Sequence, residues 1–272
     1  MSDYKKTNDL TEKTALIDTD LLRIDDSADE FAWKKATIAN VSTKVQADII
    51  ADDNTFTGTN VFPTINIGTG NTVSGDNATA EGSGTTASGG NSHSEGYYTI
   101  ASGLVSHAEG YYSTASGENS HAEGSWSEAR LKSQHAQAGG KFAVNGDAQN
   151  TKIVAHKETT DATPIECITE NAQRYVIPSG FIMACTVSIN GSNADGSVAG
   201  FYKRQALIKN IAGTTALIDT VQTIGTDIEM GTIGGIAITA DDTNDSLLVT
   251  ITGKADETIR WVCVIDALEV GH

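Results

Sequence analysis

The sequence predicts an all-β protein in which a parallel β-roll of 14-residue repeats precedes an antiparallel β-sandwich. Three observations lead to this prediction. A repeat with a fixed period of 14 residues runs through the middle of the chain, and the last third alternates apolar and polar residues between turns. The 272 residues include 27 glycines and three prolines, which suits many short strands and tight turns better than long helices. We divide the chain into residues 1–62, 63–148 and 149–272.

The first region, residues 1–62, is mainly polar. Its alternating segment 15–26 predicts a strand or a pair of strands, Trp33–Ile38 predicts a returning strand, and 39–51 allows one short helix. No compact core is visible, so these strands are expected to pack against a partner chain. Residues 1–13 lack the apolar stretch of a signal peptide, and no segment approaches the ~18 apolar residues of a membrane span. We therefore expect neither a secretion signal nor membrane insertion.

The second region, 63–148, contains the repeat. Two units are nearly identical: SHSEGYYTIASG begins at Ser92, and SHAEGYYSTASG begins at Ser106. Histidines and glutamates extend the same phase in both directions: His93, His107, His121 and His135, and Glu81, Glu95, Glu109 and Glu123. Each unit has two short extended pieces closed by glycine, which supplies the positive φ that a corner needs. One unit therefore predicts one coil of a flattened parallel roll, with coils about 4.8 Å apart.

The positions expected to face the inside of the roll hold alanine, serine, threonine and glycine, with very few large aliphatic residues. A single roll with so thin a core would bury too little apolar surface to be stable alone. Three identical chains around a common axis would provide the missing contacts. The sequence therefore predicts a homotrimer.

The in-phase histidines and glutamates are expected to form two parallel rows. Because side chains alternate along a strand, His93 and Glu95 lie on one face, opposite Ser92 and Ser94. We interpret the rows as a structural ladder in which histidine relieves the repulsion between glutamates. A pH-sensitive switch and a metal-binding ladder are the alternatives, although no unit by itself provides three converging ligands.

Aromatic residues recur at the corner that follows the first glycine of each unit. They are Tyr97, Tyr98, Tyr111, Tyr112 and Trp126. Exposed aromatic rings in a row are candidates for binding a sugar or a protein receptor. The alternative interpretation is that the rings pack across the trimer at this corner.

The repeats resemble the left-handed parallel β-roll of trimeric autotransporter adhesin heads, and the form Ser-His-Ala-Glu-Gly resembles the version found in phage tail-fibre proteins. Residues 18–26 and 37–41 are similar to the N-termini of many phage fibres, and 55–62 resembles a linker in such fibres. The resemblance covers about half the chain. It implies a left-handed trimeric roll whose N-terminal region docks to a phage tail or baseplate protein. The pattern decays after Gly124, as expected where the next domain caps a solenoid.

The third region, 149–272, predicts a β-sandwich of about nine short strands that resembles a jelly roll. Candidate strands are Lys152–His156, Ile165–Thr169, Arg174–Ile177, Phe181–Ile189, Gly200–Lys209, Ala216–Thr223, Gly235–Ala240, Ser246–Thr252 and Thr258–Leu268, and candidate turns are 190–192, 212–214 and 254–256. The layout is similar to the C-terminal knob domains of phage fibres, including Phe201–Arg204 and Ile259–Val262. This similarity implies that the knob binds a glycan or protein on the host surface.

Charge and motifs argue against other classes of protein. A net charge of −17 disfavours binding to nucleic acid and to anionic membranes. Cys167, Cys185 and Cys263 lie in apolar runs without metal-site spacing, so we expect buried free thiols made in a reducing cytoplasm. No hydrolase or nucleotide-binding motif occurs. We expect no enzymatic activity, no cofactor and no metal requirement.

The leading interpretation is a structural virion protein of a phage tail: a homotrimeric fibre, made in the host cytoplasm, that mediates attachment to the host cell. A head fibre, a decoration protein or a tail connector without receptor binding would share these features. A bacterial surface adhesin would need a secretion signal and an outer-membrane anchor. A polysaccharide depolymerase or a self-cleaving protein is the remaining alternative.

Overall fold

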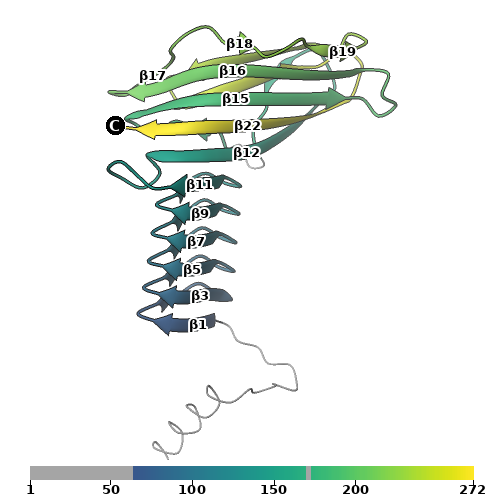
Figure 1. Cartoon of the computed structure of the whole chain (residues 1–272). Coiled ribbons are helices and arrows are strands. Elements are labelled where there is room, and N and C mark those ends of the chain that lie inside the picture. Colours follow the sequence, from purple (N-terminus) through teal and green to yellow (C-terminus); the bar gives the residue numbers. More distant parts are fainter. Residues whose placement is uncertain (1–63, 170–172) are drawn as a thin grey trace, which may run out of the picture. The chain divides into compact units, whose positions relative to one another are not determined.

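The computed structural model describes residues 64–169 and 173–272, and within these ranges the secondary structure consists of strands and turns. The predicted strands and helix in residues 1–62 lie outside the described residues. A parallel β-solenoid over residues 64–139 is followed by antiparallel sheets, which confirms the predicted order of a roll and then a sandwich (Figure 1). No helix within the described ranges has the length and apolar character needed to cross a membrane.

Each of the first five coils of the roll contains one long and one short strand, and the sixth contains one long strand. The long strands are β1 (Thr64–Thr69), β3 (Ala78–Ser83), β5 (His93–Tyr97), β7 (His107–Tyr111), β9 (His121–Ser125) and β11 (His135–Gly139); the short ones are β2 (Thr72–Val73), β4 (Thr86–Ala87), β6 (Ile100–Ala101), β8 (Thr114–Ala115) and β10 (Glu128–Ala129). All pairs within the roll are parallel, and each residue lies beside the residue 14 positions further along, as His93 lies beside His107. The sequence period is therefore the register of the sheet.

The interior of the roll is built from small side chains. Its buried apolar residues are alanines: Ala78, Ala80, Ala87, Ala101, Ala108, Ala115, Ala122, Ala129, Ala136 and Ala138. Serine and threonine hydroxyls share this interior, and some bind each other or the backbone, as Ser94 and Thr99 do at 2.8 Å. The expected thin core is confirmed. Small side chains fit here because two strands of one coil face each other across a narrow space.

Two columns of glycine permit the coils to stack. At Gly96 the backbone has φ +109°, and an added Cβ would lie 2.2 Å from the carbonyl oxygen of Gly110. At Gly103 an added Cβ would lie 2.0 Å from the carbonyl oxygen of Gly117. In the last coil the same two phases hold Ala138 and Leu131. No further coil stacks on it, because β11 pairs with the antiparallel strand β12 instead. This change of neighbour explains why the repeat decays after Gly124.

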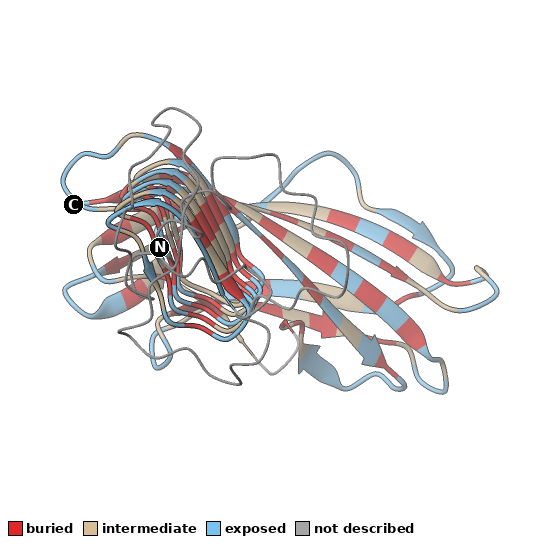
Figure 2. Cartoon of the chain, turned by 90° about the horizontal axis from the view of Figure 1, so that it is seen from below, coloured by how far each residue is buried: buried red, intermediate tan, exposed pale blue. Residues whose placement is uncertain are grey.

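The sandwich begins where β12 (Ala148–Thr159) pairs with β11. One layer follows the order β12, β22 (Ile259–Gly271), β15 (Phe181–Ser192), β16 (Ala199–Ile211) and β17 (Thr214–Leu217), and β18 (Gln222–Thr223) and β19 (Ile228–Met230) also pair with β16. The second layer contains β13 (Pro164–Glu166), β14 (Tyr175–Val176), β20 (Gly235–Asp241) and β21 (Ser246–Thr252). Buried and exposed residues alternate along the strands (Figure 2), and Trp261, Met183 and Ile251 pack in one core between the layers. The predicted antiparallel sandwich is confirmed.

Four details of the sandwich differ from the sequence prediction. Its main strands β12, β15, β16 and β22 are 12 or 13 residues long, longer than predicted, because the alternation continues through residues that resemble turns. The predicted turn 190–192 is wrong. Gly191 lies within β15, where an added Cβ would be 2.4 Å from the ring of Trp261. Glycine is required here because the Trp261 ring occupies the space of a side chain, and not because the chain turns. The predicted strand 216–223 is two strands, β17 and β18, and β19 was not predicted.

A buried polar cluster joins the roll to the sandwich. The Glu269 side chain in β22 is 2% exposed and is bound by the Arg130 guanidinium of the last coil. Gln149 Nε2 donates to the same carboxylate at 3.0 Å, and Thr151 Oγ1 at 2.6 Å. The Tyr175 hydroxyl, 3.3 Å from Glu269, has a pKa well above its usual value because of burial and the nearby carboxylate. The three cysteines are buried free thiols, as expected.

Candidate functional site

The His–Glu ladder, which we define as His93, His107, His121, His135, Glu81, Glu95, Glu109 and Glu123, lies on the outer face of the long strands. Strand alternation places it there, because the residues between, such as Ser94 and Ala108, face the interior. The imidazole rings stack with centroids 4.8, 4.7 and 4.8 Å apart and with interplanar angles of 2–10°. The parallel register thus converts the 14-residue period into a continuous column of rings.

The two rows of the ladder contact each other across coils. The Nε2 atom of His107 lies 3.7 Å from Oε1 of Glu95, in the preceding coil. The same atoms are 3.1 Å apart for His121 and Glu109, and 3.4 Å apart for His135 and Glu123. Each of these histidines therefore faces the glutamate 12 residues earlier in the chain.

Local electrostatics favour the neutral form of the central histidine. Burial lowers the pKa of His107, and the neighbouring imidazoles of His121 and His93 lower it further, whereas Glu109 and Glu95 oppose the shift. A neutral imidazole has one nitrogen with a free lone pair, which can accept a hydrogen bond or bind a metal ion.

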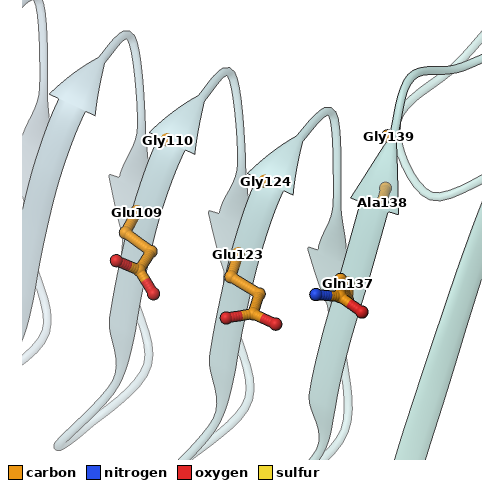
Figure 3. A pocket seen from close by; sticks show the side chains of 7 residues that line it. All are labelled: Glu109, Gly110, Glu123, Gly124, Gln137, Ala138 and Gly139. Atoms are coloured by element: carbon orange, nitrogen blue, oxygen red, sulfur yellow. The ribbon is translucent and has the colours of Figure 1, made fainter.

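A shallow groove runs along the upper part of the glutamate row. Glu109, Glu123 and Gln137 project from neighbouring strands into it in the same direction (Figure 3). The groove has a volume of about 550 Å³ and is floored by the glycine column at Gly110 and Gly124. Its ligands would meet carboxylate oxygens on an open surface rather than an enclosed pocket.

The aromatic corner, which we define as Tyr97, Tyr98, Tyr111, Tyr112 and Trp126, forms two stacked columns within one chain. The centroids of Tyr97 and Tyr111 are 5.4 Å apart, those of Tyr98 and Tyr112 are 5.2 Å apart, and those of Tyr112 and Trp126 are 4.3 Å apart. Tyr98 packs over Gly84, where an added Cβ would be 2.8 Å from its ring. The faces of the rings thus contact one another, and the edges of the rings remain available to bind a ligand.

The backbone under one of these columns is strained. Tyr98, Tyr112 and Trp126 have φ values of 51°, 55° and 66°, in the left-handed region where Gly70 and Gly84 stand in earlier coils. This conformation costs a residue with a side chain about 1–2 kcal/mol. Stacking compensates, since an aromatic pair contributes about 0.5–1.5 kcal/mol beyond its buried area.

The strain predicts an order of stability at Tyr112. Tyr112→Ala loses the ring contacts and keeps the strain, whereas Tyr112→Gly loses the contacts and relieves it. We expect the glycine variant to be the more stable of the two by about 0.5–1 kcal/mol in urea unfolding. At Thr114, which lies in β8 with ordinary strand backbone, alanine should be more stable than glycine. If the alanine variant were more stable than the glycine variant at both Tyr112 and Thr114, this account would be contradicted.

A loop that the sequence analysis did not single out lies beside the aromatic corner. The Lys141 ammonium is 3.4 Å from the centroid of the Trp126 ring, and Asn145 Nδ2 donates to the carbonyl oxygen of Tyr112 at 3.0 Å. Three backbone amides of residues 142–144 donate to the Asp147 carboxylate, which lowers its pKa although burial opposes the shift. Phe142 is 76% exposed. In the sequence, Phe142 is an isolated aromatic residue shortly before Asn145-Gly146-Asp147, and this pattern could have indicated the loop.

The third surface is the outer knob face, defined by the exposed apolar residues Val154, Phe201, Leu207, Val262, Leu268 and Val270. They share one face, since Leu268 pairs with Ala184 and Ala184 with Leu207, and Val262 pairs through Asn190 with Phe201. The pairing of His135 with Lys152 and of Gln137 with Asn150 places the His–Glu ladder on this same face of the sheet. A group of exposed apolar side chains of this kind marks a contact surface.

No protein-family model and no curated protein matches the sequence. The fold is distantly similar to solved phage tailspikes. A tailspike of Acinetobacter baumannii bacteriophage Fri1, a capsular polysaccharide depolymerase, is 8% identical with a TM-score of 0.28, over 69% of this chain and 39% of that chain. The tailspike of Acinetobacter baumannii phage AM24 is 10% identical with a TM-score of 0.26, over 75% and 49%. That of Acinetobacter phage vB_ApiP_P1 is 7% identical with a TM-score of 0.23, over 77% and 46%. This chain spans less than half the length of each of these tailspikes.

Proposed function

We propose that this chain is a structural subunit of a phage tail fibre that trimerises and attaches the virion to the host cell. The observation that carries the proposal is a regular roll of 14-residue coils, whose Ser-His-Ala-Glu-Gly repeat resembles that of phage tail-fibre proteins, joined to a sandwich whose outer knob face carries exposed apolar side chains. In this proposal residues 1–62 dock to the tail or baseplate, the left-handed roll acts as a stalk, and the knob meets a glycan or protein of the host surface.

The outer knob face supports self-association. Leu268 is 60% exposed and Val154 52% exposed in a single chain, although both lie in the middle of a sheet. The alanine-filled roll also leaves little apolar surface buried within one chain. Packing three outer knob faces around an axis would bury these side chains and compensate for the thin roll core.

The oligomeric state tests this proposal. We expect the full chain to have the mass of three 28.5 kDa subunits, about 86 kDa, by light scattering at micromolar concentration. Leu268→Glu should shift the mass to 28.5 kDa, because three buried carboxylates would meet at the interface. Thr239→Glu is the matched control, since Thr239 is exposed on β20 of the second layer. A monodisperse wild-type monomer would refute the trimer.

Attachment is tested with the labelled full chain on a panel of bacterial strains. The trimer should bind host cells and block infection by the phage that carries it. The Leu268→Glu monomer should bind about 100-fold more weakly, because three linked knobs bind one cell surface with higher avidity than a single knob does. A trimer that binds no susceptible strain would favour a head fibre or a tail connector. Detection of the chain by antibody on the surface of the cells that produce it, rather than on virions, would favour an adhesin.

The proposal includes no catalytic role. Cleavage of a glycosidic bond uses two carboxyl groups, one of them protonated, on either side of an enclosed sugar. Glu109 and Glu123 instead line an open groove and face histidines. Release of reducing ends from host capsular polysaccharide by the wild-type chain, and its loss in Glu109→Gln, would favour a depolymerase.

A further inference from the structure

The His–Glu ladder brings metal-binding side chains together in a way that no single repeat does. Three groups form across coils: Glu81 with His93 and Glu95; Glu95 with His107 and Glu109; and His121 with Glu123 and His135. In each group the donor atoms lie within 4.8 Å of one another. Each group therefore combines residues from two neighbouring coils, and the first two groups share Glu95.

Two imidazole nitrogens in these groups are shielded from solvent but make no hydrogen bond among the described residues. They are Nε2 of His93 and Nε2 of His107, and the latter lies 3.7 Å from the Glu95 carboxylate. A shielded polar atom without a partner is unfavourable, because it has given up its hydrogen bonds to water and gained none in return. A cation between the nitrogen and the carboxylates would satisfy both kinds of donor at once.

The charges of the ladder also favour a bound cation. Four glutamates repeat along one face at the spacing of the coils, in a chain with a net charge of −17. The stacked imidazoles 4.7–4.8 Å apart cannot all carry compensating positive charge without repelling one another. Divalent cations would neutralise the carboxylate row while leaving the imidazoles neutral.

The donor set selects the class of metal. Imidazole nitrogen with carboxylate oxygen suits Zn²⁺, Ni²⁺, Co²⁺ and Fe²⁺, whereas Mg²⁺ and Ca²⁺ prefer oxygen alone. Two histidines and one glutamate, as in His121, His135 and Glu123, form a three-ligand set that Zn²⁺ accepts with a water molecule in the fourth position.

We propose that the His–Glu ladder binds a row of divalent transition-metal ions of the zinc class, held between neighbouring coils, with Glu95 shared by adjacent ions. The group with two histidines, His121, Glu123 and His135, binds most tightly. The ions link successive coils across the face of the roll, and this stabilises a stalk whose interior holds only small side chains. The proposal does not depend on attachment to host cells.

The test measures Zn²⁺ binding to the full chain, purified without a polyhistidine tag, by isothermal titration calorimetry. We expect saturable binding of up to three ions per chain and a rise in the thermal midpoint, with Mg²⁺ and Ca²⁺ at least 100-fold weaker. The variant His121→Gln/His135→Gln should lose the tightest site and bind the remaining Zn²⁺ about 100-fold more weakly than that site. His156→Gln, which removes an exposed histidine of β12 outside the ladder, should bind like wild type.

A second readout does not depend on any variant. Co²⁺ bound to imidazole and carboxylate should give a visible absorption band that Zn²⁺ displaces at the calorimetric stoichiometry. The proposal is overturned if the wild-type chain shows no saturable Zn²⁺ binding at millimolar concentration, or if the folded ladder variant binds as tightly as His156→Gln. If the His121→Gln/His135→Gln variant does not fold, Zn²⁺ calorimetry and the Co²⁺ absorption band of the wild-type chain test the proposal by themselves.

Discussion

Replacing Gly110 with alanine is expected to destabilise the roll by about 3–5 kcal/mol or to prevent its folding. The backbone at Gly110 has φ +98°, and an added Cβ would lie 2.1 Å from the carbonyl oxygen of Gly124 in the next coil. Cβ atoms essentially never lie within 3.0 Å of a non-bonded heavy atom, so the methyl group requires the two coils to separate. Separation breaks the parallel hydrogen bonds between β7 and β9, which carry the stack.

Gly140→Ala is the matched control for this prediction. Nothing lies within 4 Å of an added Cβ at Gly140, and its φ is not in the left-handed region. We expect this variant to be unchanged or slightly more stable, because alanine restricts the unfolded chain. Urea unfolding followed by circular dichroism compares the two at equal protein concentration. Equal midpoints for Gly110→Ala and Gly140→Ala would contradict the close packing of Gly110 against Gly124.

The period of the repeat determined most of what the sequence could predict. A 14-residue phase fixes which residues stack, so the histidine column, the glutamate column and the small interior side chains follow from alternation alone. The end of the roll was also predictable. The glycine phases lose their glycine at Leu131 and Ala138, where the next neighbour is an antiparallel strand.

Contacts between residues far apart in the sequence, and contacts that depend on the direction of individual side chains, were not predictable. Gly191 resembles a turn in the sequence, and only the position of Trp261 beneath it explains the glycine. The pairing of His107 with Glu95 depends on side-chain direction between coils, whereas the sequence shows only that both lie on one face. The stacking of tyrosine faces within one chain likewise requires knowing that the corner residues follow one another along the coil axis.

The ion pair at the junction of roll and sandwich is a further example, because Arg130 and Glu269 are 139 residues apart and neither belongs to a periodic pattern. Arg130→Ala is expected to lower the free energy of unfolding by about 3–5 kcal/mol. The reason is the environment of Glu269, which is 2% exposed and would be left with only the neutral partners Gln149, Thr151 and Tyr175 for its carboxyl group. Loss of the guanidinium also removes its contact with the Phe181 ring, 5.2 Å away.

Two further variants distinguish the effect of leaving Glu269 without its cationic partner from the effect of losing the contact between Arg130 and Phe181. Arg260→Ala removes the exposed partner of Glu158, at 3.0 Å, and should cost no more than about 1 kcal/mol because water screens that pair. The double variant Arg130→Ala/Glu269→Gln should be more stable than Arg130→Ala alone, since glutamine carries no charge and its one amide oxygen can still accept the hydrogen bond from Thr151 Oγ1. A double variant as unstable as the single one would mean that Arg130 acts through packing on Phe181, and the junction would then depend on apolar contact rather than on charge compensation.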